Sequence, residues 1–175
     1  MQKVLIISYF FPPCNLTASQ RAYSWAKHLN KFGFYPIIVT RKWEKHVRSY
    51  VDCHYATSDG DLVEKHDNYE VHYCPYSPNL RDRLHTSGKL FLIKKFLSLL
   101  ELILQNINIK FCSFNNIYVK ADELLNTQQE ISAIIISGNP FIQFKFGYKL
   151  HKKHGIPWIA DYRDAWTTST IANTV

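Results

Sequence analysis

The first 40 residues contain the feature that most narrows the fold: a strand, a helix and a second strand in succession. Val4 to Ser8 is apolar along nearly its whole length, which is typical of a strand buried on both faces. Apolar residues then recur at helical spacing up to the stop signal at Gly33, and Tyr35 to Thr40 is again apolar throughout. Such a crossover predicts parallel strands in a covered sheet, and hence the α/β class.

The crossover helix is expected to start at Thr17, whose hydroxyl can cap the first turn with Gln20 three residues later. The remaining pattern predicts a Rossmann-like parallel sheet with helices on both faces, in a single domain. Mixed charge from Arg41 to Asn68 indicates a long surface excursion. The other expected strands are Glu70 to Tyr76, Glu130 to Ser137 and Pro157 to Ala160, and the other helices are Gly88 to Ile107, Asn115 to Asn126 and the segment from Pro140 to Gly155.

Composition excludes several classes of protein. With 175 residues, 46% hydrophobic and 20% charged, the chain is one ordinary domain and not a disordered segment. It shows no signal peptide and no apolar stretch of spanning length, so we expect a cytoplasmic protein. The four cysteines have no paired spacing and are expected to be reduced thiols, and the lysines around His151 and His154 argue against a metal site.

The formal net charge of +7 favours an anionic partner: a phosphate, an anionic lipid surface or a nucleic acid. The chain has no aromatic-basic motif and no recognition helix, so we expect no nucleic-acid binding. The segment from Leu90 to Ile107 has a basic front, Lys94 and Lys95, followed by apolar residues at helical spacing. Two interpretations of it stay open: an interfacial helix on anionic lipid, or ordinary core packing.

Ligands of an open parallel sheet bind beyond the carboxyl ends of its strands, where the strand order reverses. Three segments are expected there: Phe11 to Arg21, Ser137 to Pro140 and Asp161 to Asp164. Arg21 stands in the first turn of its helix, where the macrodipole disfavours a cation. It therefore either meets a bound phosphate or carboxylate, or reaches solvent or pairs with Asp161 or Asp164.

The last of these segments places three charges, Asp161, Arg163 and Asp164, directly after a buried strand. Such charges must pair or bind something, because burial of an unpaired charge is costly. The carboxylates can orient sugar hydroxyls or act as a base, and Arg163 can meet a phosphate. Trp166 offers a flat face of the kind on which sugars stack, although packing explains it equally.

Five segments, in this order and spacing, carry a resemblance to a known family: Lys3 to Pro13, Arg21, Ala26 to Gly33, Ser137 to Pro140, and Gly155 to Trp166. They resemble the N-terminal domain of bacterial family-four glycosyltransferases, which have the two-domain GT-B architecture. The resemblance covers residues 1 to 40 and 131 to 166. The sequence departs from the pattern of that family at two places. Cys14 to Leu16 contain no glycine where many relatives have glycines, and Arg163 stands near a position where many have a histidine.

The resemblance implies a retaining transferase that moves a sugar from a nucleotide-sugar to a cell-envelope polysaccharide or lipid-linked acceptor. Residues 1–166 would be the acceptor-side domain and 167–175 the start of a linker or a truncated tail. The donor-binding C-terminal domain would be a missing partner, so the chain would be inactive alone, and the nucleotide-sugar would be a co-substrate in place of a cofactor. The implied catalytic residues are Asp164 and Arg163, and the implied substrate contacts are Pro13, Asn15, Thr17, Arg21, Ser137, Gly138, Asn139, Asp161 and Trp166.

Such an enzyme would work in the cytoplasm, and the basic helix could bring it to the inner face of the plasma membrane. A second function, that of a binding module and not of an enzyme, stays open. The chain could be a stand-alone Rossmann-like module that binds a phosphate-bearing ligand through Arg21 and Arg163 without catalysis.

Overall fold

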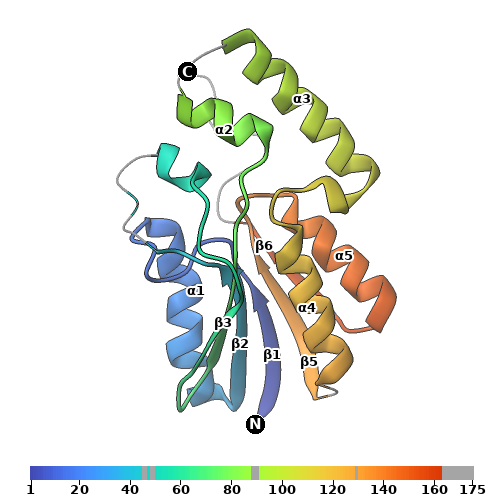
Figure 1. The fold of residues 1–175 in the computed structure, drawn as a ribbon. Coiled ribbons are helices and arrows are strands. Elements are labelled where there is room, and N and C mark those ends of the chain that lie inside the picture. The colour runs from blue at the N-terminus through green and yellow to red at the C-terminus, as the bar shows by residue number, and fades with distance from the viewer. Residues whose placement is uncertain (45–46, 48–49, 88–90, 129, 163–175) are drawn as a thin grey trace.

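The computed structural model describes residues 1–44, 47, 50–87, 91–128 and 130–162, and its centre is a six-stranded sheet (Figure 1). The strands are β1 (Gln2–Ile7), β2 (Phe34–Arg41), β3 (Leu62–Lys65), β4 (Glu70–Cys74), β5 (Ile131–Ser137) and β6 (Trp158–Asp161). The helices are α1 (Thr17–His28), α2 (Leu80–Ser87), α3 (Phe91–Ile107), α4 (Asn115–Thr127) and α5 (Gln143–His154), with short 3₁₀ helices at Leu29–Phe32, Tyr50–His54 and Ile109–Phe111.

The strand order is β3-β4-β2-β1-β5-β6, with β1 parallel to both β2 and β5. β4 and β6 extend the parallel arrangement on either side, and β3 pairs antiparallel with β4 at one edge. The chain therefore moves outward from β1 through β2 to β4, and then returns to build β5 and β6 on the other side. This is a Rossmann-like α/β sheet, as predicted, and its order reverses between β1 and β5.

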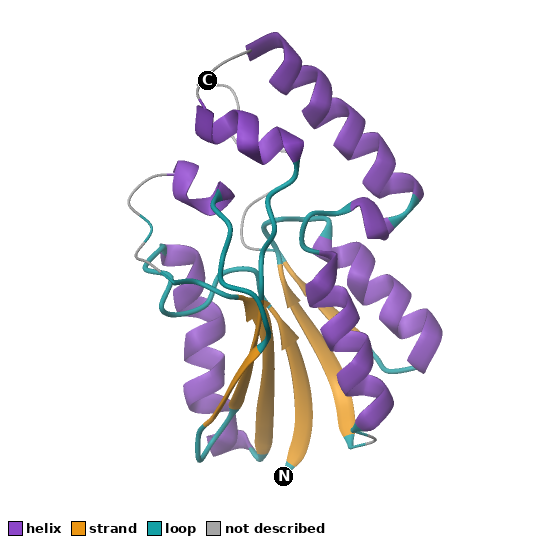
Figure 2. Cartoon of the chain, viewed as in Figure 1, coloured by secondary structure: helices purple, strands orange, loops and turns teal. Residues whose placement is uncertain are grey.

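Helices cover both faces of the sheet, which explains why β1 and β2 are apolar on both sides (Figure 2). On one face, Ala22 and Ala26 of α1 pack with Val4 and Ile6 of β1. On the other, α4 and α5 pack against the alternate residues of the same strands. The residues that form this second core layer include Leu5, Ile7, Ile37, Val39, Ile117, Ala121, Leu124, Ile134, Ile136 and Leu150.

The predicted cap of α1 is wrong, and the predicted stop is right. Leu16 is the N-cap residue with an extended backbone, and no side chain caps this end of the helix. Thr17 is already the first helical residue, so its hydroxyl lies one position too late to cap the free N–H groups. The helix tightens into a 3₁₀ turn and ends at Gly33, which has a φ of 84°.

The predicted surface excursion from Arg41 to Asn68 is wrong for its first part and right for its second. The first part contains the 3₁₀ helix at Tyr50–His54 and buries Trp43, Val47 and Cys53, whereas residues 55–68, which include the edge strand β3, are almost all exposed. Arg41 anchors the segment, because the guanidinium donates hydrogen bonds to the carbonyl oxygens of Cys53 and Tyr55. The segment is fixed by these long-range contacts, which leave no periodic trace in its sequence.

Helices α2 and α3 lie beyond the carboxyl ends of the parallel strands, with α3 on the outer side (Figures 1 and 2). α2 was not predicted, and α3 begins at Phe91, close to the expected start. Core packing is the wrong interpretation of α3. Six of its apolar side chains are between 49% and 79% exposed: Leu92, Phe96, Leu99, Leu102, Ile103 and Ile107.

In the described part of the chain, no helix has the length and apolar character needed to cross a membrane.

All four cysteines are buried free thiols, as expected. Burial raises the pKa of Cys74 and Cys112 to about 12, so both stay protonated and unreactive at neutral pH.

Candidate functional site at the carboxyl edge of the sheet

Near the point where the strand order reverses, α1 meets the carboxyl ends of β5 and β6, at the edge of the sheet that the sequence predicts. Arg21 Nη1 lies 2.7 Å from Asp161 Oδ1. Ser137 Oγ donates to Asp161 Oδ2 at 3.4 Å, and the backbone N–H of Gly138 donates to the Asp161 carbonyl oxygen at 2.8 Å. We call Arg21, Ser137, Gly138 and Asp161 the switch-point cluster.

Of the interpretations left open for Arg21, the structure shows the ion pair with Asp161. The pair is accessible, since the side chain of Arg21 is 42% exposed and that of Asp161 19%. Arg21 is the fifth residue of α1, one position beyond the predicted first turn, and Asp161 offsets its charge. The first turn of α1 contains no acidic residue, so the helix N-terminus adds a positive potential at this corner. An anionic group could approach the guanidinium without displacing any buried contact.

A glycine is required at position 138 for these loops to meet. A Cβ there would lie 2.8 Å from Phe144 Cζ and 3.1 Å from the Asp161 carbonyl oxygen. The next residue, Asn139, adopts a φ of 75°, which turns the chain away from β5 and toward α5. The side chain of Asn139 then lines a cavity next to the cluster.

Three predicted substrate contacts do not join the cluster. Asn15 Oδ1 accepts a hydrogen bond of 2.9 Å from the backbone N–H of Val47, so this side chain holds the 41–57 segment instead. Pro13 lines a separate hollow of about 940 Å³ with Trp43 and its neighbours. Thr17 is exposed on α1. Arg163, Asp164 and Trp166, predicted as catalytic or substrate-binding residues, and the predicted linker 167–175 lie outside the described residues.

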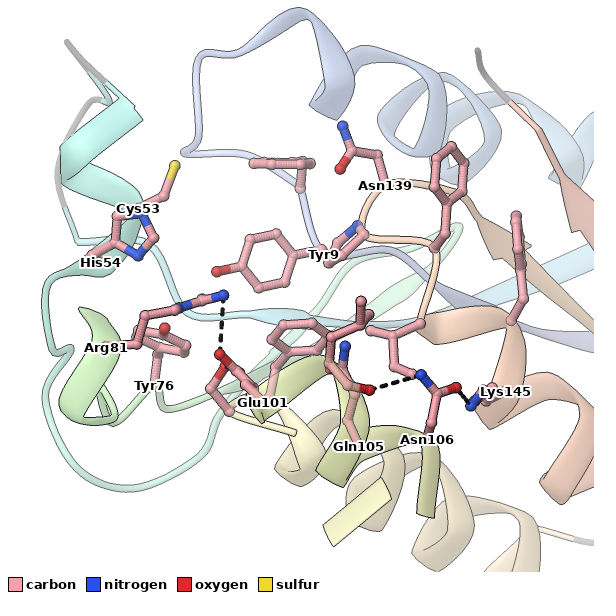
Figure 3. Close-up of a pocket in the computed structure, with 18 of the residues that line it drawn as sticks. Tyr9, Cys53, His54, Tyr76, Arg81, Glu101, Gln105, Asn106, Asn139 and Lys145 are labelled. Carbon is pink, nitrogen blue, oxygen red and sulfur yellow. Dashed lines mark hydrogen bonds and ion pairs between the residues drawn. The ribbon is translucent and has the colours of Figure 1, made fainter. Parts of the chain in front are cut away.

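A cavity of about 740 Å³ lies between the strand-end loops and α3 (Figure 3). We call it the strand-end cavity. It is large enough for a ligand of one or two sugar rings, and sites of this size commonly combine aromatic walls with a few polar groups. Its lining includes Tyr9, Phe10, His54, Tyr76, Arg81, Glu101, Gln105, Asn106, Phe114, Asn139, Phe141, Phe144, Lys145, Tyr148 and Trp158.

One end of the cavity is a buried polar network centred on Asp82, which is fully buried. Its carboxylate accepts from Tyr76 Oη at 2.5 Å and from Arg81 Nη2 at 2.9 Å, and lies 2.9 Å from His54 Nδ1. Arg81 also bridges to Glu101 of α3 through Nη1 at 2.9 Å (Figure 3). The network thus fastens both α2 and α3 to the edge of the sheet.

The same network sets the charge of Asp82. Burial alone would raise the pKa of this carboxyl, but hydrogen bonds from His54, Tyr76 and Arg81 outweigh it and hold the pKa below its usual range. Asp82 is therefore ionised at every pH near neutrality. An ionised carboxylate orients the His54 ring by accepting from its Nδ1–H.

Tyr9 is held at the cavity wall by Arg41. The Arg41 guanidinium donates to Tyr9 Oη and lies over the rings of Trp43 and Tyr76, 4.3 and 3.9 Å from their centroids. Burial is the main influence on the Tyr9 phenol and raises its pKa, so the hydroxyl stays protonated. The contacts of one buried cation with several aromatic faces stabilise this wall.

The opposite end of the cavity is aromatic. Phe144 contacts both Phe141 and Trp158, with ring centroids 5.9 and 6.4 Å apart. On the α3 side, Lys145 donates to the side-chain oxygen of Asn106 (Figure 3). The cavity therefore offers flat apolar surfaces beside hydrogen-bonding groups, a combination that suits the ring faces and hydroxyls of a sugar.

Sequence reasoning missed this polar network because it treated residues 41–68 as surface and left residues 77–87 unassigned. A local signal was present at the start of α2. The backbone N–H of Asn79 donates to Asp82 Oδ2 at 3.2 Å, and the N–H of Asp82 donates to Asn79 Oδ1 at 3.0 Å. This reciprocal pair is a capping box, which the spacing Asn-x-x-Asp could have indicated.

Metal chemistry has no candidate in the described residues, where no three His, Cys, Asp or Glu side chains gather. His154 Nε2 lies 2.7 Å from Asp122 Oδ1, and Lys153 pairs with the same carboxylate. His151 Nδ1 lies 2.9 Å from the carbonyl oxygen of Ile156. These histidines join α5 to α4 and to the loop before β6.

The fold and site define a Rossmann-like α/β domain with a candidate ligand site at the switch point of its sheet. No protein-family model matches the chain, and no curated protein matches it. Among solved structures it is similar to the C-terminal domain of a hydrogenase from Pyrococcus furiosus, at 17% identity and a TM-score of 0.43, over 92% of this chain and 91% of that one. A second structure of that domain matches at 15% identity and the same TM-score, over 91% and 90% of the two chains.

Proposed function

We propose that this domain is the acceptor-binding half of a retaining glycosyltransferase, which moves a sugar from a nucleotide-sugar to a cell-envelope polysaccharide or lipid-linked acceptor. The observation that carries the proposal is the strand-end cavity, an aromatic and polar pocket of about 740 Å³ that adjoins the switch-point cluster. The sequence resemblance to family-four glycosyltransferases supports the same assignment. The donor-binding domain would be a separate partner, and we propose a cytoplasmic location.

The proposal gives each part of the site a role. The acceptor sugar occupies the cavity, with its ring against Phe144 and Trp158 and its hydroxyls near Gln105 and Asn106. Arg21 and the N-terminus of α1 face the donor diphosphate, since both favour negative charge. Asp161 keeps the guanidinium in position through the 2.7 Å ion pair. Arg163, Asp164 and Trp166 remain proposed contacts of the reacting groups.

The proposal is tested by supplying a donor-binding domain, in trans or in a continuous two-domain form, and measuring transfer from a panel of nucleotide-sugars. We expect transfer only when both parts are present.

A Gln105→Trp variant should fill the cavity and raise the acceptor KM at least tenfold, because the indole occupies the space of the sugar. Asn126→Trp, on the exposed side of α4, is the matched control and should leave KM unchanged. Absence of transfer with every nucleotide-sugar would contradict the proposal.

Arg21→Ala should lower kcat/KM for transfer at least tenfold, because the donor diphosphate loses its cationic contact. The free energy of unfolding should change by less than about 1 kcal/mol, since the pair with Asp161 is partly exposed. Steady-state kinetics and urea unfolding of the same variant check both expectations. Saturable pyrophosphate binding by the chain alone, lost in Arg21→Ala and without transfer in any two-domain form, would instead identify the stand-alone binding module.

A further inference from the structure

Helix α3 turns its polar side toward the protein and exposes its apolar side to solvent, the reverse of a helix that packs on a core. Glu101 and Gln105 turn inward to line the strand-end cavity. Leu92, Phe96, Leu99 and Ile103 lie along the other side, one helical turn apart, and are 79%, 64%, 56% and 49% exposed. Water therefore meets the apolar side of the helix, which costs free energy unless another apolar phase covers it.

The exposed side of α3 continues past the end of the helix. Ile107 is 74% exposed and Phe111, in the following 3₁₀ turn, is 54% exposed. The 17 residues of α3 alone extend about 25 Å. We call Leu92, Phe96, Leu99, Leu100, Ile103, Ile107 and Phe111 the outer stripe.

Among the described residues of α3 and the 3₁₀ turn that follows it, the exposed charged side chains are lysines. They are Lys95 and Lys110, beside the outer stripe. Glu101 is the only acidic residue of α3, and Arg81 and Ser113 hold it on the inner side. The complementary surface must therefore be apolar and edged with negative charge.

The shape of the surface distinguishes between possible occupants. α3 packs on α2 and on the 3₁₀ turn at Ile109–Phe111, and it projects at the outer end of the molecule (Figure 1). It thus presents one side of a single helix, whereas a stable protein interface needs about 800 Å² of matched surface on each partner. A bilayer accepts a single helix directly, because an interfacial helix sinks its apolar side about 5–10 Å below the headgroups.

We propose that the outer stripe of α3 docks on an anionic lipid bilayer, with Lys95 and Lys110 at the level of the phosphate headgroups. Docking in this way places the inner side of α3, and hence the strand-end cavity, directly above the membrane surface. The inference goes beyond the proposed function, because binding to lipid requires neither a donor domain nor sugar transfer. Its failure and the failure of the transferase proposal are therefore separately observable.

The test is flotation of the chain with vesicles of phosphatidylcholine alone, and of phosphatidylcholine containing about one third phosphatidylglycerol. We expect binding to the anionic vesicles, weakened by added salt, and little binding to the neutral ones. Phe96→Glu should weaken binding to the anionic vesicles at least tenfold. Phe32→Glu is the matched control, because Phe32 is 72% exposed in the 3₁₀ turn before β2, and it should bind like the unmodified chain.

Circular dichroism of both variants checks that they fold, which their exposed positions favour. No flotation with anionic vesicles would overturn the proposal, as would equal losses in Phe96→Glu and Phe32→Glu. A dimer in sedimentation equilibrium that Phe96→Glu dissociates, in a chain that does not float, would assign the stripe to a second copy instead.

Discussion

Replacing Asp82 with asparagine is expected to lower the free energy of unfolding by about 3 kcal/mol at pH 7. The amide keeps the size of the carboxylate but removes its charge and replaces one of its two acceptor oxygens with an NH₂ donor. Either the buried hydroxyl of Tyr76 on one oxygen, or Arg81 and His54 on the other, then loses its acceptor. Because Asp82 is fully buried, water cannot replace that acceptor. Urea unfolding followed by circular dichroism measures the difference.

The contribution of Asp82 to the free energy of unfolding should depend on pH, and its lowered pKa fixes the direction. The pKa of Asp82 is lower in the folded state than in the unfolded chain, where it is about 3.9. The stabilisation is therefore complete at pH values well above 3.9, and it is lost as the pH falls toward the folded-state value. The stability gap between the unmodified chain and Asp82→Asn should narrow below about pH 4, over the range in which both still fold. A gap that stays constant there would contradict this account.

Asp122→Asn is the matched control for the Asp82 experiment. Asp122 also has a lowered pKa, because the opposing effect of its partial burial is outweighed by hydrogen bonds from Lys153 and His154. Its side chain is 20% exposed and that of Lys153 is 50% exposed. Solvent screens such a pair, so the expected loss is within about 1 kcal/mol. Similar losses for the two variants would show that burial does not set the strength of the Asp82 network.

Replacing Gly147 with valine should have a comparably large effect, a loss of about 3 kcal/mol, and alanine a loss of about 2 kcal/mol. A Cβ at this position would lie 2.4 Å from Trp158 Cε3 and 2.6 Å from Ile136 Cδ1. α5 would have to move away from β5 and β6, and the better helix propensity of alanine offsets at most about 1 kcal/mol of that cost. Thermal and urea unfolding of both variants test the order.

Gly60→Ala separates this packing effect from the effect of glycine's backbone freedom. Gly60 has a φ of 83° with no atom within 4 Å of its added Cβ, so alanine there should cost about 1 kcal/mol through backbone strain alone. Gly147→Ala should be the more destabilising of the two. Since Trp158 lines the strand-end cavity, Gly147→Val should also weaken acceptor binding, whereas Gly60→Ala should not. The reverse order of stabilities would contradict the close contact of α5 with the sheet.

Much of the sheet could be predicted because its strands and crossover helices have local signatures. The apolar runs of β1 and β2 and the helical repeat between them depend on neighbouring residues, so period and composition suffice. The same reasoning placed Arg21, Ser137, Gly138 and Asp161 at one edge, since parallel strands end together. It could not choose between the ion pair of Arg21 with Asp161 and a bound anion, because that choice depends on the distance between side chains 140 residues apart.

The middle of the chain was predicted poorly, for a physical reason. β3 is exposed along its length and exists because β4 offers it an antiparallel edge, which no local pattern announces. Arg41 is buried at 2% exposure because aromatic rings and carbonyl oxygens from distant residues surround it. A charged residue in a polar segment would otherwise be assigned to the surface.

By itself, the sequence determined the α/β class, the order of most elements and the edge of the sheet at which a ligand would bind, because hydrophobic period and strand direction are local properties. Only the tertiary structure decided that Asp82 joins His54, Tyr76 and Arg81 in one buried network. It also decided the orientation of α3. An amphipathic pattern specifies two sides of a helix but not which one faces the protein, and here the Arg81–Glu101 bridge turns the polar side inward and leaves the apolar side outside.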